Sequence, residues 1–186
     1  MTGNPVRQSL LTHLTSHEEA IGNFGLNPAK KTILILGGSL GARTINQTLT
    51  AELESIRANF DIQFIWQTGK IYINQVREAI TAATGEPVRQ PHIPAIPNLY
   101  VTDFIKDMAQ AYAAADLVIS RAGAGSISEF CLLHKPVILV PSPNVAEDHQ
   151  TQNALALVNK GAAIFVKDAE ANEKLLPDRK STRLNS

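Results

Sequence analysis

Two glycine-containing segments have residue types and a setting that suit the binding of a phosphate group. Gly37, Gly38 and Gly41 lie in the first segment, between an apolar run and a pattern typical of a helix. The second segment, residues 121–129 (RAGAGSISE), has the same setting. Glycine allows the backbone to approach a ligand closely, and the start of a helix offers unpaired N–H groups with partial positive charge. One interpretation of each segment is therefore a phosphate site, with the Ser39 hydroxyl as a further donor at the first.

Each segment also has an explanation that needs no ligand. Ser39 is suited to be the N-cap of the helix after the first segment. In the second segment, Ser126 and Glu129 have the spacing of a capping box. The alternative is that the backbone amides of residues 124–126 face a second phosphate, while the Glu129 carboxylate accepts hydrogen bonds from two neighbouring sugar hydroxyls. The residues alone leave both explanations open.

A third segment, residues 141–153 (PSPNVAEDHQTQN), leads into a predicted helix that Asp148 is suited to cap. The amides of Gln150 and Asn153 fall near the start of that helix, where they can bind sugar hydroxyls. The alternative is a solvated first turn without a ligand. His149 has no Ser or Cys nucleophile near it in the sequence, so a catalytic triad has no support.

Other common sites fit the sequence poorly. The first glycine segment lacks the second glycine of the G-x-G dinucleotide pattern, and no acidic residue ends the strand after the second. The Gly-Lys-Ser/Thr of a P-loop does not occur. His, Cys and Asp residues have no metal-ligand spacing, so we expect no metal. Cys131, between Phe130 and Leu132, is expected to be a small buried residue. Because the two glycine segments match the dinucleotide pattern only in part, an NAD-binding domain is the second interpretation.

Six short apolar segments, each suited to a strand buried on both faces, alternate with patterns typical of helices. The predicted strands are residues 32–36, 62–66, 99–102, 117–120, 137–140 and 163–166, and the predicted helices are residues 42–57, 73–83, 107–115, 126–133 and 150–159. Gly161 is expected to end the last helix in a left-handed conformation. Residues 85–98, which contain four prolines, are expected to form an irregular surface connection.

This alternation predicts an α/β fold with a doubly wound, mostly parallel, six-stranded Rossmann-like sheet, because parallel strands need crossover connections. Ligands of such sheets bind at the carboxyl ends of the strands. The site is therefore expected after Leu36, Thr102, Ser120 and Val140, and the three segments described above follow Leu36, Ser120 and Val140.

The composition limits the class of protein. The chain has 186 residues, with 17 Lys and Arg against 17 Asp and Glu, so a basic surface for nucleic acid is not expected. A hydrophobic content of 44% and a single Cys indicate a globular protein of a reducing compartment. The sequence contains neither a signal peptide nor an apolar run near the ~20 residues that span a bilayer. We expect a soluble, cytoplasmic protein.

Five segments together resemble the MurG family, the bacterial N-acetylglucosaminyltransferases that convert lipid I to lipid II in peptidoglycan synthesis. In order, they are residues 2–7 (TGNPVR), 37–43 (GGSLGAR), 104–108 (FIKDM), 121–129 and 148–154 (DHQTQNA). The family has a GT-B fold, in which two Rossmann-like domains face each other across a cleft. The resemblance implies that this chain is the C-terminal half, which binds the donor UDP-GlcNAc.

The resemblance also implies roles for individual residues. Arg7 and Ser39 would contact the diphosphate, the Ile105 backbone would pair with the uracil edge, and Glu129 would hold the ribose hydroxyls. Backbone amides of Ala124, Gly125, Ser126, Ile127 and Ser128 would face phosphate and sugar, while Gln150, with Asn153 nearby, would contact the GlcNAc hydroxyls. The family is an inverting transferase that needs no metal or other cofactor for the donor, and none of these residues would be the catalytic base.

The resemblance divides the chain into three parts. Residues 1–29 would be an interdomain linker or edge segment, residues 30–177 the UDP-sugar-binding domain, and residues 178–186 a tail foreign to the fold. The acceptor lipid I would bind an N-terminal domain that we do not expect in this chain, so the fragment would be inactive alone. The full-length family acts at the cytoplasmic face of the bacterial inner membrane as a peripheral protein. A UDP-GlcNAc epimerase-like enzyme and a non-enzymatic nucleotide-binding module remain as alternatives.

Overall fold

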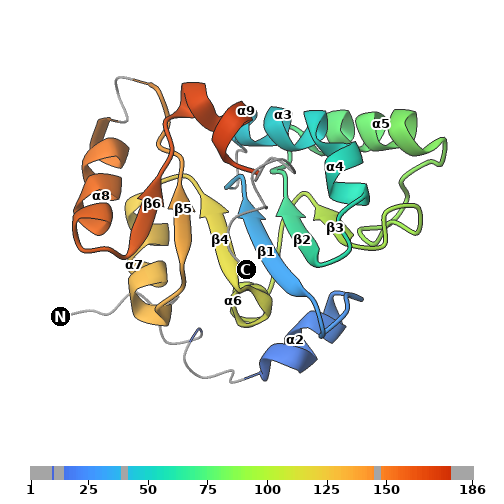
Figure 1. Cartoon of the computed structure of the whole chain (residues 1–186), viewed down its shortest axis with the longest axis horizontal. Helices are drawn as coiled ribbons and strands as arrows, with labels where there is room; N and C mark the ends of the chain where they lie inside the picture. Colours follow the sequence, from blue (N-terminus) through green and yellow to red (C-terminus); the bar gives the residue numbers. More distant parts are fainter. Residues whose placement is uncertain (1–9, 11–14, 39–41, 145–147, 177–186) are drawn as a thin grey trace, which may run out of the picture.

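The central feature of the molecule is a six-stranded sheet in which every strand pairs in parallel with its neighbours (Figure 1). A computed structural model describes Leu10 and residues 15–38, 42–144 and 148–176. The strands are β1 (Lys31–Leu36), β2 (Ile62–Gln67), β3 (Leu99–Thr102), β4 (Leu117–Ser120), β5 (Val137–Leu139) and β6 (Ala163–Phe165), in the order β3-β2-β1-β4-β5-β6. The predicted doubly wound parallel sheet is therefore confirmed.

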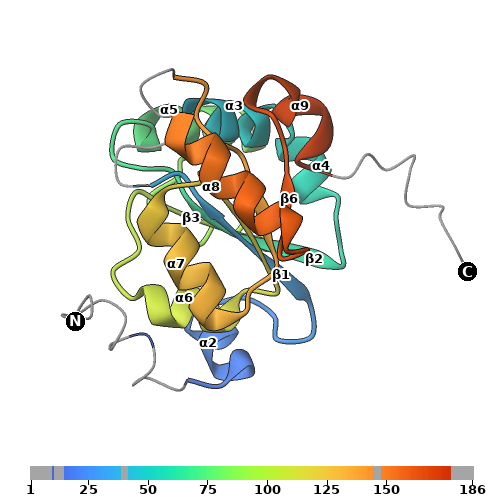
Figure 2. The ribbon, with the colours of Figure 1, turned by 90° about the vertical axis from the view of Figure 1, so that its left-hand side faces the viewer.

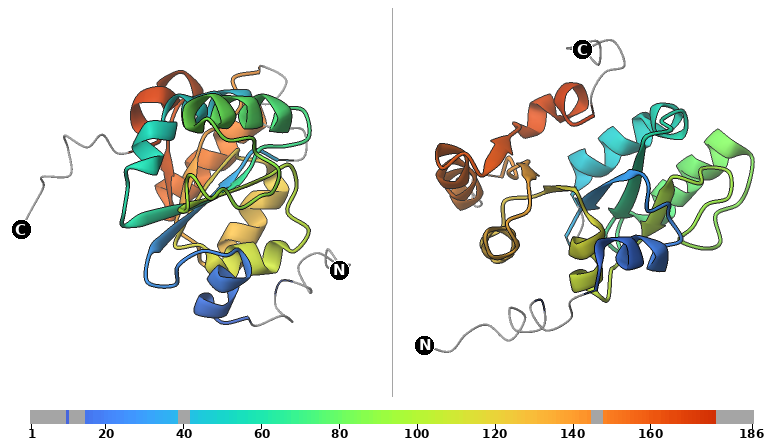
Figure 3. Two further views of the ribbon diagram at one scale, coloured as in Figure 1. Left: turned by 90° about the vertical axis from the view of Figure 1, so that its right-hand side faces the viewer. Right: turned by 60° about the horizontal axis from the view of Figure 1, so that its bottom comes forward.

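Helices cover both faces of the sheet, as Figures 2 and 3 show. One face packs against α3 (Arg43–Ala51), α4 (Leu53–Arg57), α5 (Ile73–Thr84) and α9 (Ala171–Lys174), which follows the short 3-10 helix η2 (Asp168–Glu170). The other face packs against α2 (His17–Asn23), α6 (Met108–Ala114), α7 (Ala124–Leu133) and α8 (Asp148–Asn159). Two layers of helices enclose the sheet. The edges that remain for loops are those at which the strands begin and end.

The alternation of side chains along β1 shows why its sequence is apolar throughout. Ile33 and Ile35 belong to the hydrophobic cluster under α3, whereas Leu34 and Leu36 belong to the cluster under α6. Successive residues of a strand point to opposite faces, and both faces are covered here. The continuous apolar run that predicted a fully buried strand is therefore explained.

The predicted helix over residues 42–57 is wrong in one respect, because it is divided into α3 and α4 at Glu52. The hydroxyl groups of Thr48 and Thr50 donate to the carbonyl oxygens of Thr44 and Asn46, at 2.8 Å and 2.7 Å. Such bonds to the preceding turn bend a helix. The apolar spacing continues across the break, since both pieces pack on the same face of the sheet, so periodicity gave no sign of it.

The connection over residues 85–98 contains neither helix nor strand, as predicted, but it is not confined to the surface. Ile93 and Ile96 are buried in the core. Asn98 is also buried, and its side-chain amide donates to the carbonyl oxygens of Ile56 and Ile62, at 2.7 Å and 3.1 Å. This segment packs because its two isoleucines join the core and Asn98 satisfies one carbonyl in α4 and one at the start of β2.

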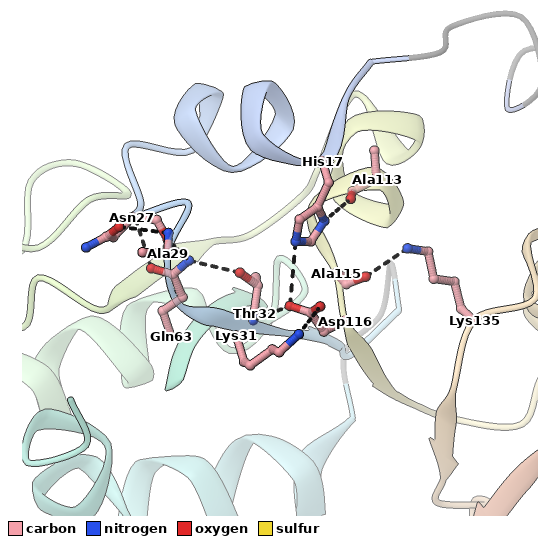
Figure 4. A network of polar contacts seen from close by, with 10 residues as sticks. All are labelled: His17, Asn27, Ala29, Lys31, Thr32, Gln63, Ala113, Ala115, Asp116 and Lys135. Carbon is pink, nitrogen blue, oxygen red and sulfur yellow. Dashed lines mark hydrogen bonds and ion pairs between the residues drawn. The ribbon is translucent and has the colours of Figure 1, made fainter. Parts of the chain in front are cut away.

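A polar network at the amino end of β1 fixes α2 to the sheet (Figure 4). The Asp116 carboxylate accepts hydrogen bonds from the backbone N–H of Thr32 at 2.8 Å and from Lys31 Nζ at 3.3 Å. His17 contacts the carbonyl oxygen of Ala113 through Nδ1, at 2.8 Å. Residues of α2 thus share a core with the strands, and the division of the chain at residue 30 stays a prediction.

A buried amide joins α3 to β2. Asn46 accepts a hydrogen bond from Trp66 Nε1 at 2.9 Å, and its own amide donates to the carbonyl oxygen of Thr68 at 2.8 Å. Asn46 and Trp66 are both buried. The pair orients α3, whose first residues border the carboxyl ends of the strands.

We expect Asn46→Ala to lower the free energy of unfolding by about 1–3 kcal/mol, because it leaves the buried Trp66 N–H and Thr68 carbonyl without partners. Urea unfolding followed by tryptophan fluorescence measures this change. The control is Gln47→Ala, the exposed neighbour in the same helix, which should change the free energy of unfolding by less than about 0.5 kcal/mol. Equal effects of the two substitutions would contradict the role of Asn46.

Candidate functional site

A polar cavity lies at the carboxyl edge of the sheet, beside the neighbouring ends of β1 and β4. Its volume is about 620 Å³. The cavity is lined by Arg43, Thr44, Gln47, Tyr72, Arg121, Ser142, Pro143, Asn144 and Gln150. The chain leaves β1 toward α3 on one face and β4 toward α7 on the other, so this is the switch point of the sheet. Open α/β sheets bind ligands in the crevice at this point.

A second cavity, of about 510 Å³, lies between α7, α8 and the edge strand β6. Phe130, Val137 and Leu157 contribute an apolar lining, and the cavity extends to the loop at His134 and Lys135, before β5 begins. It is therefore away from the carboxyl ends of the strands. We place the candidate site in the polar cavity, where convergent side chains and the switch point coincide.

The first residue after β4, Arg121, connects the loops around the cavity. Its Nη1 donates to the carbonyl oxygens of Val140 and Pro141, both at 3.2 Å, and forms an ion pair with Asp168. Asp168 in turn accepts a hydrogen bond from the Thr44 hydroxyl at 2.7 Å. One guanidinium thus joins the ends of β4 and β5, the segment after β6 and the start of α3.

The remaining donors of Arg121 are available to a ligand. Its Nε and Nη2 donate to no acceptor in the part of the chain that the structure describes, and the side chain lines the cavity. An arginine fork suits phosphate or carboxylate. Sequence reasoning gave Arg121 no role of its own and missed Asp168, because residues 47 positions apart in sequence show no spacing that pairs them.

The first glycine segment is required by the fold itself. The N–H of Gly37 donates to the carbonyl oxygen of Gln67 at 2.9 Å, and a Cβ on Gly37 would lie 3.0 Å from that same oxygen. Gly38 has a φ of 73°, a conformation that favours glycine. The N-cap of α3 is Ala42, so the alternative in which Ser39 caps this helix is wrong. Ser39, Gly41 and Arg7 lie outside the described residues.

The second glycine segment differs, because nothing in the described fold requires its glycines. An added Cβ on Gly123 or Gly125 would meet no described heavy atom within 4 Å, and neither residue has a positive φ. The open space lies at the start of α7. Glycine at these two positions therefore leaves room next to a helix N-terminus.

The start of α7 also overturns the capping box. Gly123 is the N-cap and provides no side-chain hydrogen bond, and the first N–H bonded within the helix is that of Ile127, to the Gly123 carbonyl oxygen at 3.0 Å. Ser126 is thus already inside the helix. The backbone N–H groups of residues 124–126 donate to no described acceptor, as is usual in the first turn of a helix, and whether they face a ligand stays a prediction. The Ser128 hydroxyl donates to the Ala124 carbonyl oxygen at 3.1 Å.

Glu129 has a partner that the sequence did not indicate. Its Oε2 accepts a hydrogen bond from the hydroxyl of Tyr112, on α6, at 2.7 Å. Burial raises the pKa of Tyr112 well above its ordinary value, and the bond to Glu129 and the charge of that carboxylate raise it further. Tyr112 therefore remains a donor at neutral pH, and Glu129 is only partly buried.

Ile105 follows β3 and is buried. Its N–H donates to Oε1 of Gln67 at 2.9 Å, so this group is already satisfied within the chain. No donor in the described ranges contacts the Ile105 carbonyl oxygen. The Ile105 backbone is expected to pair with a ligand. Because its N–H is already bonded, only its carbonyl oxygen remains for such a contact among the described groups.

The third segment places one predicted residue in the cavity. Gln150 lines it and accepts a hydrogen bond from the N–H of Ser142 through Oε1, at 3.0 Å, which leaves the amide NH₂ for a ligand. Asn153 lies one turn later on α8 and is partly buried. The helix begins at Asp148 itself rather than after it.

Two expectations about other side chains can be compared with the structure. Cys131 is exposed, so the expectation that it is buried is wrong. It lines the apolar cavity between α7, α8 and β6, which is open to solvent. Over the described residues, no three His, Cys, Asp or Glu side chains gather in a way that would hold a metal ion. None of the helices described has the length and apolar content needed to cross a membrane.

A doubly wound sheet with a polar cavity at its switch point and an open helix start at α7 defines a Rossmann-like domain, a class whose sites suit phosphate-containing ligands. A family model described as "Glycosyltransferase family 28 C-terminal domain" matches residues 32–183. The chain therefore belongs to this glycosyltransferase family, and the predicted C-terminal half of a GT-B fold is confirmed.

Curated relatives agree with this family. The chain is 73% identical over 186 residues to a UDP-N-acetylglucosamine--N-acetylmuramyl-(pentapeptide) pyrophosphoryl-undecaprenol N-acetylglucosamine transferase of Bacteroides fragilis, covering all of the chain and 46% of the relative. It is 70% identical to the protein of the same name from Bacteroides thetaiotaomicron, over 95% of the chain and 45% of that protein. The chain thus spans about half the length of the curated relatives it matches.

Solved structures show the same fold. The chain is similar to the crystal structure of MurG from Acinetobacter baumannii, with a TM-score of 0.61 and 30% identity over 83% of this chain and 42% of that one. The C-terminal CMP-Kdo binding domain of WaaA from the same organism has a TM-score of 0.54 at 15% identity, over 83% of this chain and 81% of that domain. The resemblance derived from the five sequence segments is confirmed by these matches.

We expect Asp168→Ala to lower the free energy of unfolding by about 1–3 kcal/mol, because the Arg121 guanidinium, whose side chain is 18% exposed, would lose its counter-charge. Guanidinium chloride unfolding measures this change. The control is Lys174→Ala, which removes the exposed ion pair with Glu170 on the same segment and should leave the unfolding midpoint unchanged. An unchanged midpoint for Asp168→Ala would show that the Arg121 ion pair is not structural.

Proposed function

We propose that this chain binds UDP-GlcNAc and is the donor half of an inverting N-acetylglucosaminyltransferase that adds GlcNAc to lipid I in peptidoglycan synthesis. The observation that carries the proposal is the start of α7, where three backbone N–H groups have no described partner and two glycines leave space. A diphosphate is the ligand suited to such a helix start. The names of the relatives and the family support the choice of UDP-GlcNAc.

In this proposal the diphosphate binds the amides of Ala124, Gly125 and Ser126, together with the free donors of Arg121. Arg7 and Ser39 would complete the phosphate contacts from segments outside the described residues. Gly37 and Gly38 shape the neighbouring turn after β1, and Gly41, outside the described residues, would belong to the same phosphate loop. Charge on the departing UDP is stabilised by the guanidinium and the helix start, which are in place before the bond breaks.

The two ends of the donor would be held by different loops. Glu129 accepts hydrogen bonds from the ribose hydroxyls, and the carbonyl oxygen of Ile105 accepts from the uracil N–H. The GlcNAc hydroxyls contact the amide of Gln150, with Asn153 nearby, and the backbone at Ile127 and Ser128 faces the sugar. Of these residues Gln150 lines the cavity, and the others lie on the segments and helices that follow the carboxyl ends of β3, β4 and β5.

During transfer, the acceptor hydroxyl would attack the anomeric carbon of GlcNAc, and the bond from that carbon to the UDP oxygen would break. The proton of the hydroxyl would pass to a base outside the residues described here. We propose that lipid I is bound by the rest of the full-length protein, at the cytoplasmic face of the membrane. The chain by itself would then bind the donor without transferring sugar, and its formal charge of zero gives no reason to expect nucleic acid as a partner.

Titration calorimetry with UDP-GlcNAc, UDP-glucose and NAD tests the proposal directly. We expect heat of binding for UDP-GlcNAc, weaker binding of UDP-glucose because it lacks the acetamido group, and no binding of NAD. Binding of NAD without binding of UDP-GlcNAc would overturn the proposal in favour of a dinucleotide-binding domain.

Gly125→Ala should change the affinity for UDP-GlcNAc and the free energy of unfolding in opposite directions. The added methyl group meets no described atom, and alanine favours a helix over glycine, so the free energy of unfolding should rise by about 0.5–1 kcal/mol. The same methyl group would occupy the space of the diphosphate, so we expect UDP-GlcNAc affinity to fall by about tenfold or more, a change of roughly 1.4 kcal/mol.

The matched control is Gly22→Ala in α2, where an added Cβ also meets no described atom. It should raise stability similarly and leave the affinity for UDP-GlcNAc unchanged. If Gly125→Ala binds UDP-GlcNAc as tightly as Gly22→Ala does, the diphosphate is not at the start of α7.

A further inference from the structure

A buried tyrosine hydroxyl contacts the carboxylate proposed to bind the ribose. Tyr112 lies on α6 and is only 2% exposed, and its hydroxyl donates to Glu129 Oε2 at 2.7 Å. The Tyr112 ring packs edge-on against Phe130, with centroids 6.0 Å apart and an interplanar angle of 86°. The ring is therefore held in one place by α7, and the hydroxyl has a fixed position relative to Glu129.

Glu129 has no cationic partner in the described ranges, and its side chain accepts its hydrogen bond there from Tyr112. A carboxylate on a helix surface can rotate about its terminal bonds, and a single strong hydrogen bond limits that rotation. With Oε2 engaged by Tyr112, Oε1 remains free of described donors. A carboxylate oxygen can accept more than one hydrogen bond.

We propose that Tyr112 is a positioning residue that orients the Glu129 carboxylate for the two ribose hydroxyls, and that it thereby sets the preference for ribose over 2′-deoxyribose. This inference rests on the proposed function, because it takes Glu129 as the ribose ligand. Tyr112 itself does not touch the nucleotide. Its contribution is to hold Glu129 in place before the ligand arrives, so that binding loses less side-chain freedom.

The test compares the dissociation constants of UDP and 2′-deoxy-UDP, measured by titration calorimetry on this chain. A hydrogen bond to a charged group contributes enough for the unmodified chain to prefer UDP by about tenfold or more. In Tyr112→Phe we expect UDP binding to weaken by about three- to tenfold while 2′-deoxy-UDP binding changes little. The ratio of the two constants should therefore fall toward one.

Two variants act as controls. Tyr100→Phe removes another phenol hydroxyl, from a residue that packs edge-on against Phe24 with centroids 5.0 Å apart, and it should leave the ratio unchanged. Glu129→Gln should lower the ratio as Tyr112→Phe does, and combining the two substitutions should lower it no further, because both act on one contact. Urea unfolding of each variant checks that the fold is kept.

A second variant covers the case in which Tyr112→Phe does not fold. Phe130→Leu keeps both Tyr112 and Glu129 but removes the ring that packs edge-on against Tyr112, so the phenol is held less firmly and the ratio should fall here too. If Tyr112→Phe leaves the ratio of the two dissociation constants unchanged, with or without an equal weakening of UDP and 2′-deoxy-UDP binding, the inference is overturned and the proposed function stands. If the unmodified chain binds neither nucleotide, the proposed function fails and the inference fails with it.

Discussion

The parallel pairing of β1 with β4 is the constraint on which the site depends. Leu36 pairs with Ser120, so the two strands end at the same level, and the segments that follow them emerge side by side. These are the two glycine segments, which lie more than 80 residues apart in sequence. Because the helices after β1 and β4 go to opposite faces, a crevice opens between them. The polar cavity occupies this crevice, and residues that follow β1 and β4 line it together with residues that follow β2 and β5.

Much of the fold could be predicted because burial on both faces leaves a simple pattern. Residues 32–36 are apolar throughout since helices cover each side of β1, and helical spacing in residues 73–83 reflects one buried face of α5. Gly161 has the left-handed conformation that its place after a helix predicted, with a φ of 69°. Such features depend on neighbours in sequence or on burial alone, and the sequence contains both kinds of information.

The incorrect predictions have a different cause. They concern features that depend on backbone conformation or on contacts between residues far apart in sequence. Ser126 and Glu129 have the spacing of a capping box, but Gly123 adopts the extended conformation of the N-cap, and the backbone of a glycine cannot be read from its neighbours. The partners of Glu129 and Arg121 lie 17 and 47 positions away and come from other elements. The positions of Arg7, Ser39 and Gly41 stay predictions, as do the ligand contacts given to Ile105, Gln150 and Asn153.

The ion pair between Arg121 and Asp168 has a consequence for how the energy of binding is divided. Long cationic side chains on a surface lose much rotational freedom when a ligand first fixes them. Here the guanidinium is already fixed by Asp168 and by two carbonyl oxygens, so this entropy is lost when the chain folds and not when the ligand arrives. The segment after β6 thus acts on the cavity without lining it, because it determines the orientation in which the free N–H groups of Arg121 meet an anion.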